Sequence, residues 1–355
     1  MSNIILPGKE GKKMDIAVYG AGSMGTVLGA FLQRAGIAAD LVSHDKAHIE
    51  LLRTAGAKIG GTVSFSTQPF DGNGGRGRAL LPGEMEKKYG IIFLLTKQLD
   101  NAAAAETLKN YLSPGGIVCT MQNGIPEPAL AEILGGDRVL GCICIWGANK
   151  AAPGTADLTS KAGRMHFKLG GLPGSSHPEI GEVRNILEKI GPASVEANFT
   201  GARWSKLLIN AAFSGMSAVT GFSFGDVAAG KISGGCALDL IRECIEVCRA
   251  AEIKIEPVQG IFPASFMDYK TPLKKSLLAF VMRHAMKNYG LIKSGMLGDL
   301  NRGRPCEIDA INGVVCQTGR RHNVPTPCND RIVSIVHSIE KGELGYGPQN
   351  LKLFT

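Results

Sequence analysis

The sequence of 355 residues has no long apolar run and no cluster of basic residues. Because a helix that crosses a membrane needs about 20 consecutive apolar residues, no spanning helix is expected. The net charge is +8, but the cations are spread along the chain without the arginine-rich or aromatic-interleaved segments that bind nucleic acids. We therefore expect neither a membrane nor a nucleic acid as partner, because an anionic small molecule accounts for the charge more simply.

Metal-binding and disulfide patterns are also missing, although the sequence has nine cysteines. The close pairs Cys142/Cys144 and Cys244/Cys248 lack the histidines or the second cysteine pair of a zinc site. We predict no metal site, and we interpret the cysteines as buried, reduced thiols in a cytoplasmic protein.

A glycine-rich turn follows the first apolar segment of the chain. Residues 15–19 predict a buried strand, residues 26–35 have helical composition and residues 38–43 predict a second strand. The turn between the first strand and the helix consists of Gly20, Ala21, Gly22, Ser23, Met24 and Gly25. In a dinucleotide site, such glycines allow the tight turn, the approach of the pyrophosphate and the close packing of the helix on the strand. This context predicts a dinucleotide-binding turn, with a turn that binds nothing as the alternative.

The residues after the second predicted strand bear on the choice of cofactor. Enzymes that prefer NAD usually carry an acid there, which binds the ribose 2′-hydroxyl. In this sequence Asp45 comes late, and Ser43, His44 and Lys46 could donate hydrogen bonds to a 2′-phosphate. We therefore favour NADPH as the cofactor over NADH.

Two further apolar segments, 91–95 and 117–121, predict strands that are buried on both faces. Lys97 and Asn123 follow them. Since ligands bind beyond the carboxyl ends of the strands in an open parallel sheet, we expect both residues near the ribose and nicotinamide of the cofactor. Each residue taken singly also fits a solvated turn.

The remaining residues of the first half give weaker patterns. Residues 66–88 are interpreted as a loop-rich excursion from the sheet. Residues 139–148 and 165–169 predict further strands, and Gly147 in the first of them is another candidate for binding the cofactor.

The second half of the chain changes to helical spacing. Arg203, Lys206, Asn210, Ser214 and Ser217 are spaced by three and four, so that they share one face of a predicted helix. The other faces are apolar, which indicates a largely buried helix. Because burying an unpaired ammonium group is unfavourable, we predict that the polar face lines a cleft. The solvated face of an ordinary amphipathic helix is the alternative.

Polar positions closer to the C-terminus complete the set of candidates. Glu307 precedes a helical pattern, where an acid interacts favourably with the helix dipole even without a catalytic role. Upstream, residues 294–299 form a glycine-punctuated break that is a candidate pocket wall.

These segments together resemble the ketopantoate (2-dehydropantoate) 2-reductase family, from Asp15 to about Ser338. The resemblance is carried, in order along the chain, by GAGSMG, LLTKQ, QNGIP, WSKLLIN, SGMLGD and EIDAING. It implies an α/β Rossmann-like N-terminal domain followed by an all-α C-terminal domain, and the NADPH-dependent reduction of a 2-oxo acid to a 2-hydroxy acid. We accordingly divide the chain into a disordered leader at 1–13, a dinucleotide-binding domain at 14–199 and a helical substrate and dimerisation domain at 200–355.

The resemblance also implies roles for individual residues. Lys206 matches the family's catalytic lysine, which is expected to act as a general acid, and Asn210 matches a substrate-binding asparagine. Lys97, Asn123 and Glu307 match positions around the nicotinamide half of the cofactor, and we count Glu307 with Lys206 as catalytic.

Three positions depart from the family pattern. His44 falls where relatives often have an arginine for the 2′-phosphate, Ser214 stands for an asparagine and Gly295 for a serine. We expect Ser214, and Ser294 directly before Gly295, to contact the substrate. The departures leave open a 2-oxo acid other than ketopantoate, a non-catalytic NADPH-binding sensor, and a dehydrogenase acting on the C–N bond of an amino acid or opine. A small 2-oxo acid is the expected partner, and a homodimer is left open.

Overall fold

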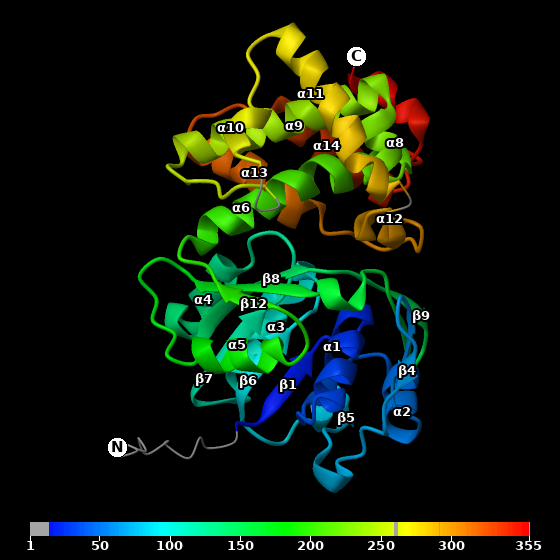
Figure 1. The fold of residues 1–355 in the computed structure, drawn as a ribbon, viewed down its shortest axis with the longest axis vertical. Coiled ribbons are helices and arrows are strands. Elements are labelled where there is room, and N and C mark those ends of the chain that lie inside the picture. Colours follow the sequence, from blue (N-terminus) through cyan, green and yellow to red (C-terminus); the bar gives the residue numbers. More distant parts are fainter. Residues whose placement is uncertain (1–13, 259–261, 291, 355) are drawn as a thin grey trace, which may run out of the picture.

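The N-terminal half of the chain forms a sheet with helices packed on its faces. The C-terminal half forms a bundle of helices that lies above this sheet in the view of Figure 1. The computed structural model describes residues 14–258, 262–290 and 292–354, so the predicted leader at 1–13 lies outside the described residues. The predicted fold class, an α/β domain followed by a helical one, is confirmed.

The main sheet consists of β1 (Ile16–Tyr19), β2 (Asp40–Val42), β5 (Ala79–Leu80), β6 (Tyr89–Leu94), β7 (Leu112–Thr120), β8 (Val139–Ile145), β11 (His166–Gly171) and β12 (Ala193–Val195). The strands lie in the order β12-β11-β8-β7-β6-β1-β2-β5. From β8 to β5 all neighbours are parallel, whereas β11 is antiparallel to β8. Strands β1 and β6 are buried along their whole length, as expected for parallel strands that are covered on both faces.

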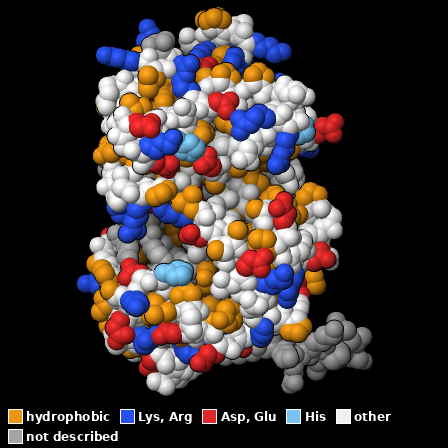
Figure 2. All heavy atoms as spheres, turned by 180° about the vertical axis from the view of Figure 1, so that it is seen from behind, with side chains coloured by type: hydrophobic (Ala, Val, Ile, Leu, Met, Phe, Trp, Pro, Cys, Tyr) orange, Lys and Arg blue, Asp and Glu red, His pale blue; other side chains and the backbone are white. Residues whose placement is uncertain are grey.

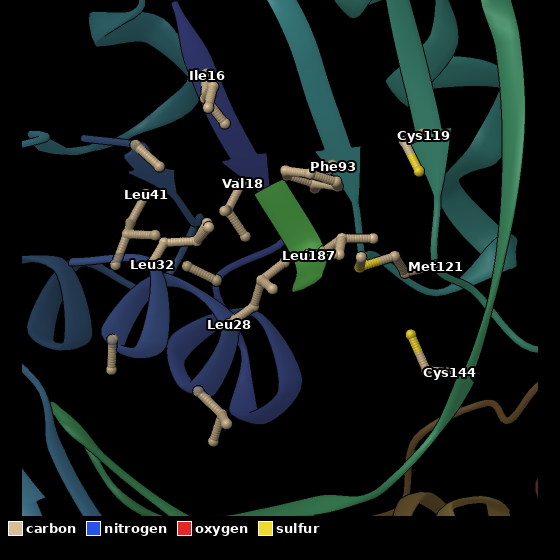
Figure 3. Packing of buried hydrophobic residues seen from close by; sticks show 14 of the residues in the cluster. Ile16, Val18, Leu28, Leu32, Leu41, Phe93, Cys119, Met121, Cys144 and Leu187 are labelled. Atoms are coloured by element: carbon tan, nitrogen blue, oxygen red, sulfur yellow. The ribbon is translucent and has the colours of Figure 1, made fainter. Parts of the chain in front are cut away.

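The helices of the N-terminal half are α1 (Ser23–Arg34), α2 (Lys46–Thr54), α3 (Asn101–Lys109), α4 (Glu127–Leu134) and α5 (Ile180–Glu188). One apolar cluster joins the sheet to α1 and α5, and another joins it to α3 and α4. Figure 3 shows Val18, Leu28 and Phe93 of the first cluster close together. The sequence analysis did not identify α3, α4 and α5, because helices of eight or nine residues show little more than two turns of periodicity.

A second sheet corrects one of the strand predictions. It contains β3 (Lys58–Gly61), β4 (Phe65–Ser66), β9 (Ala148–Ala152) and β10 (Thr155–Leu158), in the order β4-β3-β10-β9. The single strand predicted over 139–148 is wrong, because β8 ends in the main sheet at Ile145 and β9 begins in the second sheet. The segment 66–88 contains only the short β5 and two single 3₁₀ turns besides the end of β4, in line with the predicted excursion.

Among the described residues of the C-terminal half, the regular structure is helical apart from an isolated β-bridge between Val258 and Phe262. It consists of α6 (Phe199–Ile209), a π-helical turn (Asn210–Ser214), α7 (Gly215–Thr220), α8 (Phe224–Ala229), α9 (Lys231–Ala250), α10 (Ala264–Met267), α11 (Pro272–Ala285), α12 (Gly295–Leu300), α13 (Ile308–Arg321) and α14 (Pro327–Glu340). The long helix α9 packs against α6, α8, α11, α13 and α14. No helix in the described part of the chain is both long and apolar enough to cross a membrane. All nine cysteines have free thiols, and all except Cys328 are buried.

A buried ion pair attaches α6 to the sheet. The side chains of Arg203 on α6 and Glu127 on α4 are each 2% exposed. Arg203 Nε donates to Glu127 Oε1 at 2.8 Å, and Arg203 Nη1 donates to the carbonyl of Gln122, just after β7, at 2.8 Å. Because a buried charge without its partner is strongly unfavourable, the pair fixes α6 relative to the end of β7.

Removing one member of this pair should destabilise the whole protein. We expect Arg203→Met or Glu127→Gln to lower the free energy of unfolding by about 3 to 5 kcal/mol, because the remaining charged or polar group stays buried without its partner. Urea unfolding followed by circular dichroism measures the change. The control is Arg184→Ala, which removes an exposed ion pair with Glu188 and should change stability by less than about 1 kcal/mol. A similar small change in Arg203→Met would show that the pair does not hold α6.

Candidate functional site

Of the three glycines in the glycine-rich turn, Gly22 is the one that the fold does not require. Gly20 has φ +100°, and a Cβ there would lie 2.5 Å from the backbone nitrogen of Thr96. A Cβ on Gly25 would collide with the carbonyl oxygen of Gly20. A Cβ on Gly22, by contrast, would meet no atom within 4 Å, and its φ of −78° suits any residue. The open space at Gly22 is where a pyrophosphate would lie, and this cradle fits a dinucleotide.

The N-terminus of α1 adds to this fit. Gly22 is the N-cap residue of α1 and has no side chain, so no side-chain cap covers the first N–H groups of the helix. Ser23 and Met24 follow in the first turn and are partly exposed, whereas Ala21 is buried. Free N–H groups at a helix N-terminus bind phosphate groups well.

The end of β2 carries the residues that were predicted to select the cofactor. His44 and Lys46 are exposed. Asp45 is the N-cap of α2, and its carboxylate accepts a hydrogen bond from the backbone N–H of His48 at 3.0 Å. Ser43 Oγ accepts from the backbone N–H of Asp45 at 3.3 Å. Asp45 therefore caps a helix, while the side chains of His44 and Lys46 face solvent.

Lys206 is held between two strand ends of the sheet. Its Nζ donates to Asn123 Oδ1 at 2.8 Å, beyond the end of β7, and to the carbonyl oxygen of Cys144 on β8 at 2.9 Å. Burial lowers the pKa of Lys206 to about 8, and the nearby cation Arg203 adds to this effect. The structure thus joins Lys206 and Asn123, which the sequence analysis had singled out separately.

The second strand end, after β6, meets the helical half. Lys97 forms an ion pair with Asp299, whose carboxylate also accepts from Arg302 Nη2 at 2.8 Å. Asp299 is 3% exposed, so that its charge depends on these two cations. The sequence analysis placed Asp299 only within a candidate pocket wall, because nothing in the local pattern connects it with a lysine far away in the chain.

Glu307 also crosses between the two halves. Its Oε1 accepts from the backbone N–H of Gln98 at 3.0 Å, and burial raises the pKa of Glu307. Nearby, a Cβ on Gly124 would collide with the carbonyl oxygen of Ala310, which shows how closely the loop after β7 approaches α13. Glu307 therefore lies at the same contact between halves as Lys97.

The polar face predicted from Arg203 to Ser217 does not line one cleft. Arg203 is buried in its ion pair, and Ser217 is fully buried with its Oγ donating to the carbonyl of Phe222 at 2.7 Å. For these two residues the prediction is wrong. Lys206, Asn210 and Ser214 are partly exposed, and the π-helical turn over 210–214 interrupts the helical spacing on which the prediction rested.

Two further candidates have local structural functions. Ser294 is buried, and its Oγ caps α12 by accepting from the backbone N–H of Leu297 at 3.0 Å. Gly147 lies in the turn from β8 to β9, where its N–H donates to Ser160 Oγ at 3.1 Å. These contacts explain both residues without a ligand, so that their predicted contacts with substrate and cofactor stay predictions.

The surface between the two halves is hollowed in the view of Figure 2, and Lys and Arg side chains border this hollow. Among the described residues, no group of three or more His, Cys, Asp or Glu side chains could hold a metal ion. The site offers an ammonium group of lowered pKa at Lys206, and the glycine-rich turn lies at the same edge of the sheet.

Comparison with known proteins gives consistent matches along the chain. Residues 16–171 match the family described as "Ketopantoate reductase PanE/ApbA", and residues 198–340 match "Ketopantoate reductase PanE/ApbA C terminal". A 2-dehydropantoate 2-reductase from Pyrococcus horikoshii is 25% identical, with 94% of this chain and 99% of the relative covered.

Solved structures show the same fold. A ternary complex of D-mandelate dehydrogenase with NADH and anilino(oxo)acetate matches with a TM-score of 0.77 and 18% identity, covering 93% of this chain and 99% of the other. A PanE/ApbA family ketopantoate reductase from Ralstonia eutropha matches with a TM-score of 0.75 and 23% identity, with the same coverage.

Replacing Gly22 should separate ligand binding from folding. We expect Gly22→Ala to keep the melting temperature of the wild type and to weaken dinucleotide binding about tenfold or more, equivalent to about 1.4 kcal/mol, because the added Cβ enters the phosphate cradle. Isothermal titration with NADPH and NADH gives the dissociation constants. Gly136→Ala is the matched control, since a Cβ there meets only the Cβ of Ser175, at 3.9 Å, and Gly136 precedes β8 at the opposite edge of the sheet. Unchanged nucleotide binding in Gly22→Ala would contradict the assignment of the cradle.

Proposed function

The chain belongs to the ketopantoate reductase PanE/ApbA family, and from this premise we propose that it is an NADPH-dependent oxidoreductase that reduces a 2-oxo acid to a 2-hydroxy acid. The observation that carries the proposal is the position of Lys206, whose Nζ lies between Asn123 Oδ1 and the carbonyl of Cys144 at the carboxyl edge of the sheet. The glycine cradle at the same edge fits the dinucleotide.

Lys206 acts in this proposal on the oxygen of the substrate's ketone. A dinucleotide held at the glycine-rich turn would supply a hydride to the ketone carbon, and negative charge would develop on the ketone oxygen. Lys206 Nζ has a third N–H beyond those given to Asn123 and Cys144, and this group hydrogen-bonds the oxygen and donates its proton there. Burial makes that transfer easier, because it lowers the pKa of the ammonium to about 8.

The other residues hold the reactants in this arrangement. Asn123 orients Lys206 and lies close to where the ribose of the cofactor is expected, and Asn210, one turn after Lys206, binds the oxo-acid end of the substrate. Lys97 and Glu307 hold the helical half against the strand ends, so that they keep the site closed around the nicotinamide.

Two residues bear on which 2-oxo acid is the substrate. Ser214 and Gly295 stand where the resemblance expects an asparagine and a serine, and a Cβ on Gly295 would meet no atom within 4 Å. A site that has lost polar partners for a substrate hydroxyl rejects apolar tails less strongly. We therefore propose a 2-oxo acid with a larger or less hydroxylated tail than ketopantoate. A cytoplasmic location and a homodimer stay predictions.

Removal of the Lys206 side chain tests the chemical step. We expect Lys206→Ala to lower kcat by about two to four orders of magnitude, the range for a lost general acid, and to leave NADPH binding nearly unchanged. Steady-state kinetics with a panel of 2-oxo acids measure the effect, with the exposed Lys109→Ala as control. Retention of more than about a tenth of the turnover, where chemistry limits the rate, would rule out Lys206 as the acid.

The same assay on the wild type separates the alternative functions. A protein that binds NADPH but reduces none of the acids would be a non-catalytic sensor, and a requirement for an amine would indicate oxidation of a C–N bond.

The pH profile tests the same proton. Because the pKa of Lys206 is lowered to about 8, the acid is protonated below this pH and loses its proton above it. The rate of reduction, kcat/KM, should therefore be level from pH 6 to about 7.5 and fall about tenfold per pH unit above about pH 8.5. The nucleotide with deuterium at C4 shows whether hydride transfer limits the rate. A falling limb that begins only near the ordinary lysine pKa would contradict the effect of burial.

Cofactor preference tests the residues after β2. We expect a higher kcat/KM with NADPH than with NADH, because His44 and Lys46 are exposed while Asp45 caps α2. The double variant His44→Ala/Lys46→Ala should lower the ratio of the two specificity constants about tenfold or more, through loss of charge-assisted hydrogen bonds to the 2′-phosphate. A wild-type preference for NADH would make the prediction wrong and would indicate that Asp45 contacts the ribose.

A further inference from the structure

Strand β8 ends in an apolar side chain that its neighbours leave exposed. The six residues from Val139 to Cys144 are buried, whereas Ile145 is 49% exposed. Single exposed apolar residues are common on protein surfaces and need no explanation by themselves. Ile145 differs in position, because the residue before it supplies the carbonyl oxygen that binds Lys206 Nζ at 2.9 Å.

The alternation of the strand places Ile145 on the same side of the sheet as α6. Ile143 and Ile145 point to one face of β8, because successive side chains of a strand point to opposite faces. Ile143 packs in one cluster with Phe199 and Ala202 of α6. The face of α6 that carries these two residues continues to Lys206, since positions separated by three, four and seven share a helix face. Ile145, two residues beyond Ile143, is therefore level with Lys206.

The residues on either side of Ile145 point the other way. Cys144 and Trp146 belong to the apolar cluster on the opposite face of the sheet, where Figure 3 shows Cys144 together with Met121 and Cys119. Ile145 is thus the side chain that the end of β8 presents on the side of Lys206.

From this geometry we infer that Ile145 is a specificity-determining residue, an apolar wall beside Lys206 against which the tail of the substrate packs. The inference rests on the proposed function, because the ketone oxygen must bind Lys206 for the tail to reach Ile145. An apolar tail removes the exposed face of Ile145 from water, whereas a hydroxyl that packs there loses its hydrogen bonds to water. Ile145 selects branched aliphatic or aromatic 2-oxo acids over hydroxylated ones.

The test compares two substrates in matched variants. The ratio of kcat/KM for 2-oxoisocaproate to kcat/KM for ketopantoate should favour the apolar acid in the wild type and fall about tenfold or more in Ile145→Asn, since one apolar contact discriminates by about 10- to 200-fold. Ile145→Val should keep the ratio of the wild type. Val195→Asn is the control, because Val195 is also an aliphatic residue at the end of a strand, 47% exposed, but lies on β12 at the edge of the sheet.

A second measurement separates the possible failures. The dissociation constants of the product acids, 2-hydroxyisocaproate and pantoate, are measured by titration in the presence of NADP⁺ and should change in the same direction as the kinetic ratio. If the wild type reduces neither acid, the proposed function fails. If it reduces them but the ratio changes by less than fivefold in Ile145→Asn, or the wild type prefers ketopantoate, the inference about Ile145 is overturned and the reductase activity stands.

Discussion

The buried ion pair between Arg203 and Glu127 is the constraint on which the site depends. It joins α6 to α4 and to the chain after β7, and both side chains are 2% exposed. Lys206 lies one turn further along α6, so its position relative to the sheet follows from the position of Arg203. An exposed lysine on a mobile helix could not keep the lowered pKa that burial gives Lys206 here. The ion pair that fixes α6 therefore also keeps the ammonium group of Lys206 in the buried position that lowers its pKa.

A second set of contacts closes the two halves on each other at the carboxyl edge of the sheet. Lys97 pairs with Asp299, and the backbone N–H of Gln98 donates to Glu307. The loop after β7 approaches α13 so closely that only glycine fits at position 124. Strand ends from one half and helix starts from the other thus meet at the carboxyl edge of the sheet. Catalysis in such a site depends on how far these contacts exclude water, because electrostatic stabilisation is stronger in a dry environment.

Much of the fold could be predicted from local patterns, and the failures have physical reasons. Strands β1 and β6 are continuous apolar runs, and the turn from Gly20 to Gly25 has a distinctive sequence. Helices of eight or nine residues, such as α4, show too little periodicity. The break between β8 and β9 was missed because the chain passes from one sheet to another without losing its apolar character. The polar face from Arg203 to Ser217 was overextended, because a π-helical turn changes the spacing within it.

The sequence by itself determined the glycine-rich turn, the polar residues at the ends of two strands and the polar face of a helix. These local features sufficed to point to a dinucleotide turn, to Asn123 and to Lys206. Local spacing reports on contacts within a few residues, since it reflects the period of a helix or strand. Only the tertiary structure decided that Arg203 is a buried anchor and not part of a cleft, that Asp299 is the partner of Lys97, and that the carbonyl of Cys144 binds Lys206. Each of these depends on which distant segments pack together, and packing of that kind follows from the burial of whole faces of the fold, which no local pattern encodes.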